Sequence, residues 1–398
     1  MKIYCILFDT VPRHPKIKEV FEKKGLHFAD HITCSSTVPT LVTMLSGKTP
    51  TEMFGPGGIG HSHTYSNLLS TEKAKEWDEN IILHMLPEDW KIHIHSMPET
   101  RGDVHPKVEE LKVGGFSRMT KLQMTDLETN SFRLLPDDLC GRNNQMIYYN
   151  YNKNNDEDDF IENMQKLPND TWPDAYERNH FIFLKYNHYH DASRGKFVEY
   201  QGKRVDLEHE EVVDMFVDMI DRINFEEENS LFYVFADHGE PSGIDKFMRP
   251  PDSWLAWVSV TDNITARPPG FANKKVTKNI IGADEFKNTV LNRVFNKNLP
   301  NDVLSELDRD RIYVREDGRG AIDPNYGTTV SAIKSLDEHR YIQFVHHSPK
   351  AQRGEHINEE SRTIIYDKRT NDWTITETND ELVNHLKSGP WRWYFTNE

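Results

Sequence analysis

Residues 231–240 read Leu-Phe-Tyr-Val-Phe-Ala-Asp-His-Gly-Glu, an apolar run that ends in two side chains able to bind metal. A run of six apolar residues is short for a helix and is typical of a strand that is buried on both faces. The carboxylate of Asp237 and the imidazole of His238 follow at the carboxyl end of that strand. Because carboxylate and imidazole together suit zinc, manganese or a similar divalent ion, the stretch predicts a buried strand with a metal-binding edge.

A second strand of the same kind opens the chain. Residues 3–8 are apolar and Asp9 follows directly. Ligands of open parallel sheets bind at the carboxyl ends of strands, so we expect Asp9 at the same edge as Asp237 and His238. The run at residues 3–8 is too short for a signal segment, and no later stretch approaches the ~18 apolar residues of a transmembrane helix. We therefore expect no membrane anchor and a cytoplasmic or otherwise soluble intracellular protein.

Between these strands lies Thr37-Val-Pro-Thr40, and Thr37 stands directly before a helix predicted at residues 39–45, with Gly47 just past its end. A hydroxyl there lies at the positive end of a helix dipole, where both an alkoxide and a bound phosphate are stabilised. A metal at the same oxygen would lower the pKa of the hydroxyl and supply a nucleophile. Taken alone, Thr37 reads more simply as a helix N-cap. Its occurrence between Asp9 and the Asp237-His238 pair favours the catalytic interpretation.

Apolar segments and helical spacing alternate over most of the chain. Strands are predicted at residues 28–33, 81–86, 90–95 and 181–186, and helices at 16–24, 39–45 and 206–223. A loop is predicted at 51–70, and a polar insertion with weak regular structure at 101–180. This alternation predicts an α/β fold with a mostly parallel central sheet flanked by helices, in a domain that spans residues 1–305.

From residue 306 the pattern changes to short alternating segments. They lie at residues 311–314, 328–333, 340–345, 363–366 and 373–376, and a helix is expected near 380–386. Short alternating segments between polar turns predict a small antiparallel sheet. We expect residues 306–398 to form a small C-terminal α+β subdomain that packs on the first domain.

The composition of the chain limits the kinds of partner that it can bind. The 398 residues carry 48 Lys and Arg against 64 Asp and Glu, a net charge of −16. Phosphate-backbone affinity is built from clustered Lys and Arg, so no general nucleic-acid binding is expected. The three cysteines have no disulfide or zinc spacing, and Cys34 is interpreted as a structural thiol.

The segment from Ile6 to Pro50 resembles the opening of the sulfatase/phosphodiesterase branch of the alkaline phosphatase superfamily. In sulfatases the nucleophile stands ten residues before the glycine of a motif that here reads Leu45-Ser-Gly47-Lys-Thr-Pro50, and that count falls on Thr37. The stretch from Phe235 to Glu240 resembles the second metal motif of the family. The resemblance implies a metal held by Asp9, Thr37, Asp237 and His238.

The resemblance also implies residues that contact the substrate. The segment ending at His190 is similar to the strand that delivers a substrate-facing histidine, so His190 is assigned a catalytic role. His95, Lys246 and Arg249 fall near the substrate-binding positions of relatives. The implied cofactor is a divalent ion, zinc, manganese, calcium or magnesium, at one site. A second site would have to draw on His346, His347 or His356.

The chain departs from true sulfatases at the nucleophile. Sulfatases convert a Cys or Ser to formylglycine within a signal that contains Arg, whereas this chain has Thr37 and, at the Arg position, Leu41. Threonine cannot become formylglycine, and relatives with Thr are phosphodiesterases, transferases and nucleotide pyrophosphatases. We therefore expect a metal-dependent hydrolase or phosphotransferase acting on small-molecule or glycan esters. A sulfuric ester hydrolase with an unmodified nucleophile and a non-catalytic binder of phosphorylated or sulfated ligands stay open.

Overall fold

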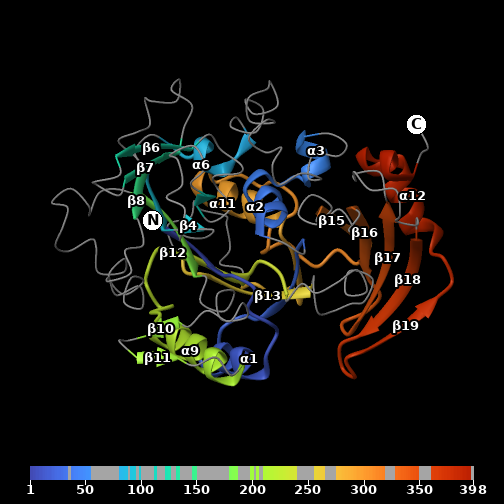
Figure 1. Cartoon of the computed structure of the whole chain (residues 1–398), viewed down its shortest axis with the longest axis horizontal. Helices are drawn as coiled ribbons and strands as arrows, with labels where there is room; N and C mark the ends of the chain where they lie inside the picture. Colours follow the sequence, from blue (N-terminus) through green and yellow to red (C-terminus); the bar gives the residue numbers. More distant parts are fainter. Residues whose placement is uncertain are drawn as a thin grey trace.

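The computed structural model describes residues 1–34, 37–54, 80–87, 90–95, 98–99, 112–113, 122–126, 131–134, 146–149, 179–186, 198–200, 203–205, 209–239, 255–264, 275–318, 328–348 and 360–395. Their elements form a helix-covered central sheet beside a second, smaller sheet (Figure 1). None of the helices in these ranges is long and apolar enough to cross a membrane. The intracellular location stays a prediction.

The central sheet has eight strands in the order β14-β2-β13-β12-β1-β9-β3-β8. Their bounds are β1 Lys2–Phe8, β2 Ala29–Ile32, β3 Trp90–His95, β8 Met146–Tyr149, β9 Asn179–Tyr186, β12 Ser230–Ala236, β13 Leu255–Asp262 and β14 Ile280–Gly282. All pairs are parallel except those that β13 makes with β12 and β2. The predicted α/β class with a mostly parallel sheet is confirmed.

Helices cover both faces of the sheet, as Figure 1 shows. On one face α1 (Pro15–Lys23) and α9 (His209–Arg222) pack over even-numbered side chains of β1, such as Tyr4 and Ile6. On the other face α2 (Thr37–Ser46), α6 (Ile82–Met85) and α11 (Glu285–Val294) cover the odd-numbered side chains. Because β1 is covered on both faces, its apolar residues run without alternation.

Four local predictions need correction. Residues 82–85 form the one-turn helix α6 rather than a strand, since a short buried apolar run looks alike in both. The expected loop at 51–70 begins with α3 (Pro50–Phe54). The predicted insertion contributes β8 to the central sheet and further short strands, β5 (Lys112–Val113), β6 (Leu122–Asp126) and β7 (Ser131–Leu134). Finally, α2 begins at Thr37, two residues before the predicted start.

The small sheet is an antiparallel meander in the order β15-β16-β17-β18-β19, as predicted. Its strands are β15 Ile312–Gly318, β16 Thr328–Ser335, β17 Arg340–Ser348, β18 Glu360–Asp367 and β19 Asp372–Thr376. The helix α12 (Asp380–Ser388) and the 3-10 helix η8 (Pro390–Phe395) pack on its outer face. Its inner face meets the main domain through Tyr313, Ile333 and Tyr341. The boundary at residue 305 stays a prediction.

Polar contacts also join the two sheets. Asp30 of β2 accepts hydrogen bonds from Tyr341 of β17 and from Arg13. The buried Glu316 of β15 accepts from the backbone N–H and the hydroxyl of Thr51, the latter at 2.8 Å, and from the indole of Trp391 in η8. Asp30, Glu316 and Trp391 are buried, so their hydrogen bonds fix how the C-terminal sheet sits on the main domain.

Candidate active site

Three side chains able to bind metal meet at the carboxyl edge of the central sheet. Asp9 follows β1, and Asp237 and His238 follow β12. One ligand atom from each lies within 4.8 Å of the other two, and all three residues are buried. The His238 Nε2 atom is 3.7 Å from Asp9 Oδ1 and 3.5 Å from Asp237 Oδ2. The sequence placed these residues at one edge, and the structure brings them together.

Strand register accounts for this meeting. β1 and β12 are parallel neighbours with Phe8 opposite Ala236, so the next residues, Asp9 and Asp237, leave the sheet side by side. Thr10 then adopts a left-handed backbone with φ +65°, which is unusual for a β-branched residue. This turn lets Thr10 N donate to Asp237 Oδ1 at 3.1 Å and its hydroxyl donate to Asp9 Oδ1 at 2.6 Å. Both carboxylates are thereby held in fixed orientations.

The tautomer of His238 is set by its own loop. Its Nδ1 lies 2.6 Å from the carbonyl oxygen of Gly239, which can only accept a hydrogen bond. Nδ1 therefore acts as the donor, and Nε2 is the ring nitrogen directed toward the two carboxylates. Two carboxylate oxygens and one imidazole lone pair form a donor set that fits a divalent ion, most closely zinc or manganese.

A lysine lies against the same cluster. Lys185 Nζ is 2.8 Å from Asp9 Oδ2, and both side chains are buried. Lys185 stands on β9, opposite Leu7 of β1, one residue before the strand ends. Sequence reasoning missed it, although a lysine inside the apolar run Phe181–Tyr186 was a usable signal, because a buried lysine requires an anionic partner.

The helix that begins at Thr37 is tied to the cluster by its first turn. The hydroxyl of Thr40 donates to the Asp237 carbonyl oxygen at 2.9 Å and accepts from Cys34 N at 3.1 Å. A single buried side chain thus connects α2, the end of β2 and the residue that follows β12. Thr37 lies one turn earlier in α2, at the N-terminal end of its dipole.

Comparison with solved structures identifies the fold. An alkaline phosphatase superfamily protein from Vibrio parahaemolyticus aligns over 100% of this chain and 88% of its own, with a TM-score of 0.53 and 11% sequence identity. The chain has the alkaline phosphatase superfamily fold. The C-terminal periplasmic domain of EcEptC from Escherichia coli aligns over 80% of this chain and 89% of its own, with a TM-score of 0.41 and 12% identity. No protein-family model and no curated protein matches the sequence.

In this alkaline phosphatase fold, the buried His31 supports the strand that carries Asp237. Its Nδ1 lies 3.3 Å from the Ala236 carbonyl oxygen, and its Nε2 lies 3.2 Å from the Tyr233 hydroxyl. Burial lowers the pKa of His31 to about 3, so the ring is neutral at physiological pH. A neutral ring can donate to the carbonyl and accept from the tyrosine, which fixes the end of β12. Sequence analysis gave no role to His31.

The structure describes three of the other predicted residues, His95, His346 and His347. His95 is the last residue of β3, at the same edge of the sheet. His190, Lys246, Arg249 and His356 lie outside the described residues. His346 and His347 are consecutive on β17 and point to opposite faces, so they cannot share one ion. The ring of His346 is already bonded to Ser361 Oγ and to the Tyr394 carbonyl oxygen.

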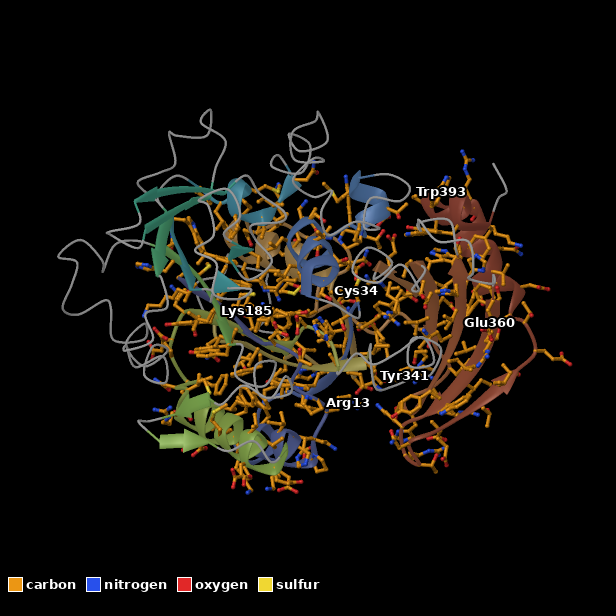
Figure 2. The ribbon with its side chains drawn as sticks, viewed as in Figure 1. Arg13, Cys34, Lys185, Tyr341, Glu360 and Trp393 are labelled. Carbon is orange, nitrogen blue, oxygen red and sulfur yellow. The ribbon has the colours of Figure 1, made fainter. Side chains whose placement is uncertain are left out.

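Cys34 fits the structural role predicted for it. It is buried two residues beyond the end of β2, on the side of the main domain that faces the C-terminal sheet (Figure 2). Burial raises the pKa of its thiol to about 11, so the thiolate is scarce at neutral pH. Its backbone, through Thr40, matters more to the site than its sulfur.

Proposed function

We propose that this chain is a metal-dependent phosphoesterase in which Thr37 is the nucleophile. The observation that carries the proposal is the buried cluster of Asp9, Asp237 and His238, tied by Thr40 to the first turn of α2. Metal ligands, an anion-stabilising helix terminus and a hydroxyl at that terminus are the three parts that such a reaction needs.

The roles of the residues follow from their positions. Asp9, Asp237 and His238 would hold the ion, which would lower the pKa of the Thr37 hydroxyl and offset charge on the phosphoryl oxygens. The N-terminal end of α2 would add backbone N–H groups for those oxygens. Lys185 would neutralise Asp9 from the side away from the ion, since its Nζ contacts the Oδ2 oxygen.

The reaction would proceed in two displacements. The Thr37 oxygen would bond to phosphorus as the bond to the leaving oxygen breaks, and the proton that the Thr37 hydroxyl gives up would pass to that leaving oxygen. A water molecule or an acceptor alcohol would then break the Thr37–phosphorus bond and regenerate the hydroxyl. Water gives hydrolysis and an alcohol gives transfer, so the proposal covers both outcomes.

Turnover of bis(p-nitrophenyl) phosphate by the purified protein tests the proposal. Activity should require an added divalent ion and should fall at least a hundredfold in Thr37→Ala. The exposed Thr374 of β19 provides a matched control, and Thr374→Ala should keep full activity. Full activity of Thr37→Ala would refute the nucleophile, and wild-type protein that binds metal without any turnover would favour the non-catalytic binder.

The sulfuric ester alternative is tested with the same protein. Hydrolysis of p-nitrophenyl sulfate should be far slower than that of the phosphate diester, because a threonine oxygen lacks the hydrate chemistry of formylglycine. A sulfate rate equal to or above the phosphate rate would replace the proposal by the sulfatase-like alternative.

A further inference from the structure

The inner face of the C-terminal sheet changes from apolar to polar along its strands. Where Tyr313, Ile333 and Tyr341 end their contact with the main domain, polar side chains continue the same face. We call this set the polar patch: Arg315 of β15, Thr329 and Ser331 of β16, and Gln343 and His347 of β17. All five residues are buried, with exposed fractions of 0–3%.

Strand register gathers the polar patch into one place. Arg315 stands directly opposite Ser331, and Thr329 stands directly opposite His347. Ser331 is also opposite Val345, whose neighbours on the same face are Gln343 and His347. Opposed side chains start about 5 Å apart and diagonal ones about 7–8 Å apart. A bound group above Ser331 therefore faces Arg315 directly across the strand pair and has Gln343 and His347 as its two diagonal neighbours.

Several polar atoms of the patch lack protein partners. Gln343 Oε1 and Nε2, Ser331 Oγ and His347 Nε2 find no hydrogen-bond partner, as judged over the part of the chain that the structure describes. Each such buried atom costs about 1–3 kcal/mol if nothing else bonds it. Not every polar group on this face lacks a partner. Ser335, on the same strand and face as Ser331, donates to the Asp337 carbonyl oxygen at 2.8 Å. Four orphaned atoms on neighbouring strands indicate a place built to receive an oxygen-rich group.

The donors of the patch select the charge of that group. Burial lowers the pKa of Arg315 to about 9, and the guanidinium is still mostly protonated at neutral pH. The imidazole Nδ1 of His347 lies 3.1 Å from Thr329 Oγ1, which leaves Nε2 for another bond. Opposite His347, the carboxylate of Glu360 is already paired with Arg362. A guanidinium, a hydroxyl, an amide and an imidazole together favour an anion with several oxygens.

A short chain of contacts leads from the patch to the nucleophile helix. Arg315 and Cys34 line the same small cleft, together with Thr43 of α2. The N–H of Cys34 bonds to the Thr40 hydroxyl, which in turn bonds to the Asp237 carbonyl oxygen. A ligand on the patch would thus lie beside the segment that positions Thr37.

We propose that the polar patch is an anion-binding subsite that receives a second anionic group of the substrate, such as a phosphate, sulfate or carboxylate remote from the ester that is cleaved. The assignment of this anion to the substrate rests on the function proposed above, whereas the anion site does not. The same chemistry would also take a free inorganic anion, and two measurements distinguish these sources.

Calorimetric titration of metal-depleted protein with sodium sulfate tests the site itself. Wild-type protein should bind sulfate, and the double variant Ser331→Ala, Gln343→Leu should bind it at least tenfold more weakly. Ser335→Ala removes a satisfied hydroxyl from the same strand and should leave sulfate affinity unchanged. Circular dichroism checks that each variant is folded. Sulfate binding that is equally tight in the double variant, or absent in the wild type, would overturn the subsite and leave a patch that is merely hydrated.

Steady-state kinetics tests the source of the anion. Two aryl phosphodiesters that differ only in an added carboxylate should differ in KM for wild-type protein, with the carboxylate lowering it about tenfold. Gln343→Leu should abolish this difference, whereas Ser335→Ala, which removes a hydroxyl already bonded to the Asp337 carbonyl oxygen, should keep it. Loss of sulfate binding without any change in substrate preference would overturn the assignment to the substrate and leave a free-anion site. If neither diester is turned over, the proposed function fails, and the sulfate titration still decides the subsite.

Discussion

Lys185 Nζ and Asp9 Oδ2 lie 2.8 Å apart at the carboxyl edge of the central sheet, and both side chains are buried. The pair places an amine nitrogen on one oxygen of a carboxylate whose other oxygen faces His238 at 3.7 Å. Asp9 is therefore shared between an internal ammonium group and the position proposed for a metal ion.

Replacement of Lys185 by Met should separate these two roles. The variant keeps a long side chain but leaves Asp9 charged and buried, so the metal-free protein should lose about 3–5 kcal/mol of stability. The loss of the lysine's positive charge beside Asp9 should also strengthen metal binding. Melting curves with and without zinc should show a larger metal-induced rise in Tm for Lys185→Met than for wild type. An equal or smaller rise would contradict a shared Asp9.

Replacement of Asp237 by Asn should remove the metal with little change in shape. The amide oxygen can still accept from Thr10 N and His238 N, which now bond to Asp237 Oδ1. The charge is lost, so zinc affinity should fall at least a hundredfold in a calorimetric titration. Asp218→Asn on α9, where the carboxylate is half-exposed, is the matched control. If Asp237→Asn bound zinc as tightly as the control, the ion would have to lie elsewhere.

Replacement of Thr40 by Val should uncouple α2 from the metal cluster. Valine keeps the shape and removes the bonds to the Asp237 carbonyl oxygen and to Cys34 N, at a cost of about 1–3 kcal/mol. Because the metal ligands are untouched, zinc affinity should persist while kcat falls and KM changes little. Thr40→Ser restores the hydroxyl and should restore kcat. A variant that loses zinc and turnover together would show that Thr40 supports the ligands instead.

The stability of the protein should depend on pH through Glu316. Burial raises its pKa from 4.5 to about 7 despite the hydrogen bonds from Thr51 and Trp391. The folded protein therefore retains a proton that the unfolded chain releases above pH 4.5, and stability is lost as pH rises from 4.5 through 7. The effect is on the order of 3 kcal/mol.

Urea denaturation at several pH values measures this dependence. The difference in free energy of unfolding between wild type and Glu316→Gln isolates the carboxyl group, because all other titrating groups occur in both proteins. As pH rises from 4.5 to 7, the free energy of unfolding of Glu316→Gln should increase relative to that of wild type. A difference that stays constant from pH 4.5 to 7 would mean that Glu316 is ionised throughout.

Sequence patterns predicted those candidate site residues that directly follow a strand. Asp9, Asp237 and His238 each follow an uninterrupted apolar run, and parallel strands bring such ends to one edge. The role of Lys185 was not predicted, because the residue lies inside a strand and the local sequence pattern does not reveal its partner. Neither the strand β13 nor its reversed direction was predicted, because Ser259, Thr261 and Asp262 interrupt the apolar residues of 255–262.

The polar patch illustrates a different limit. Ser331, Gln343 and His347 alternate with apolar residues, and alternation in a strand ordinarily indicates one face toward solvent. In the structure both faces of this sheet are covered, the outer by α12 and the inner toward the main domain. Only tertiary packing turns an ordinary solvent-facing pattern into a set of buried polar groups.

The position of β1 in the middle of the central sheet also bears on how the protein is made. Its two neighbours are β9 and β12, and the hydrogen bond from Thr10 N to Asp237 joins residues 227 positions apart. A ribosome therefore releases this apolar strand long before either neighbour exists, and both of its edges stay open to other chains in the meantime. Yield during expression should consequently depend on chaperones that shield residues 2–8 until β12 has been synthesised.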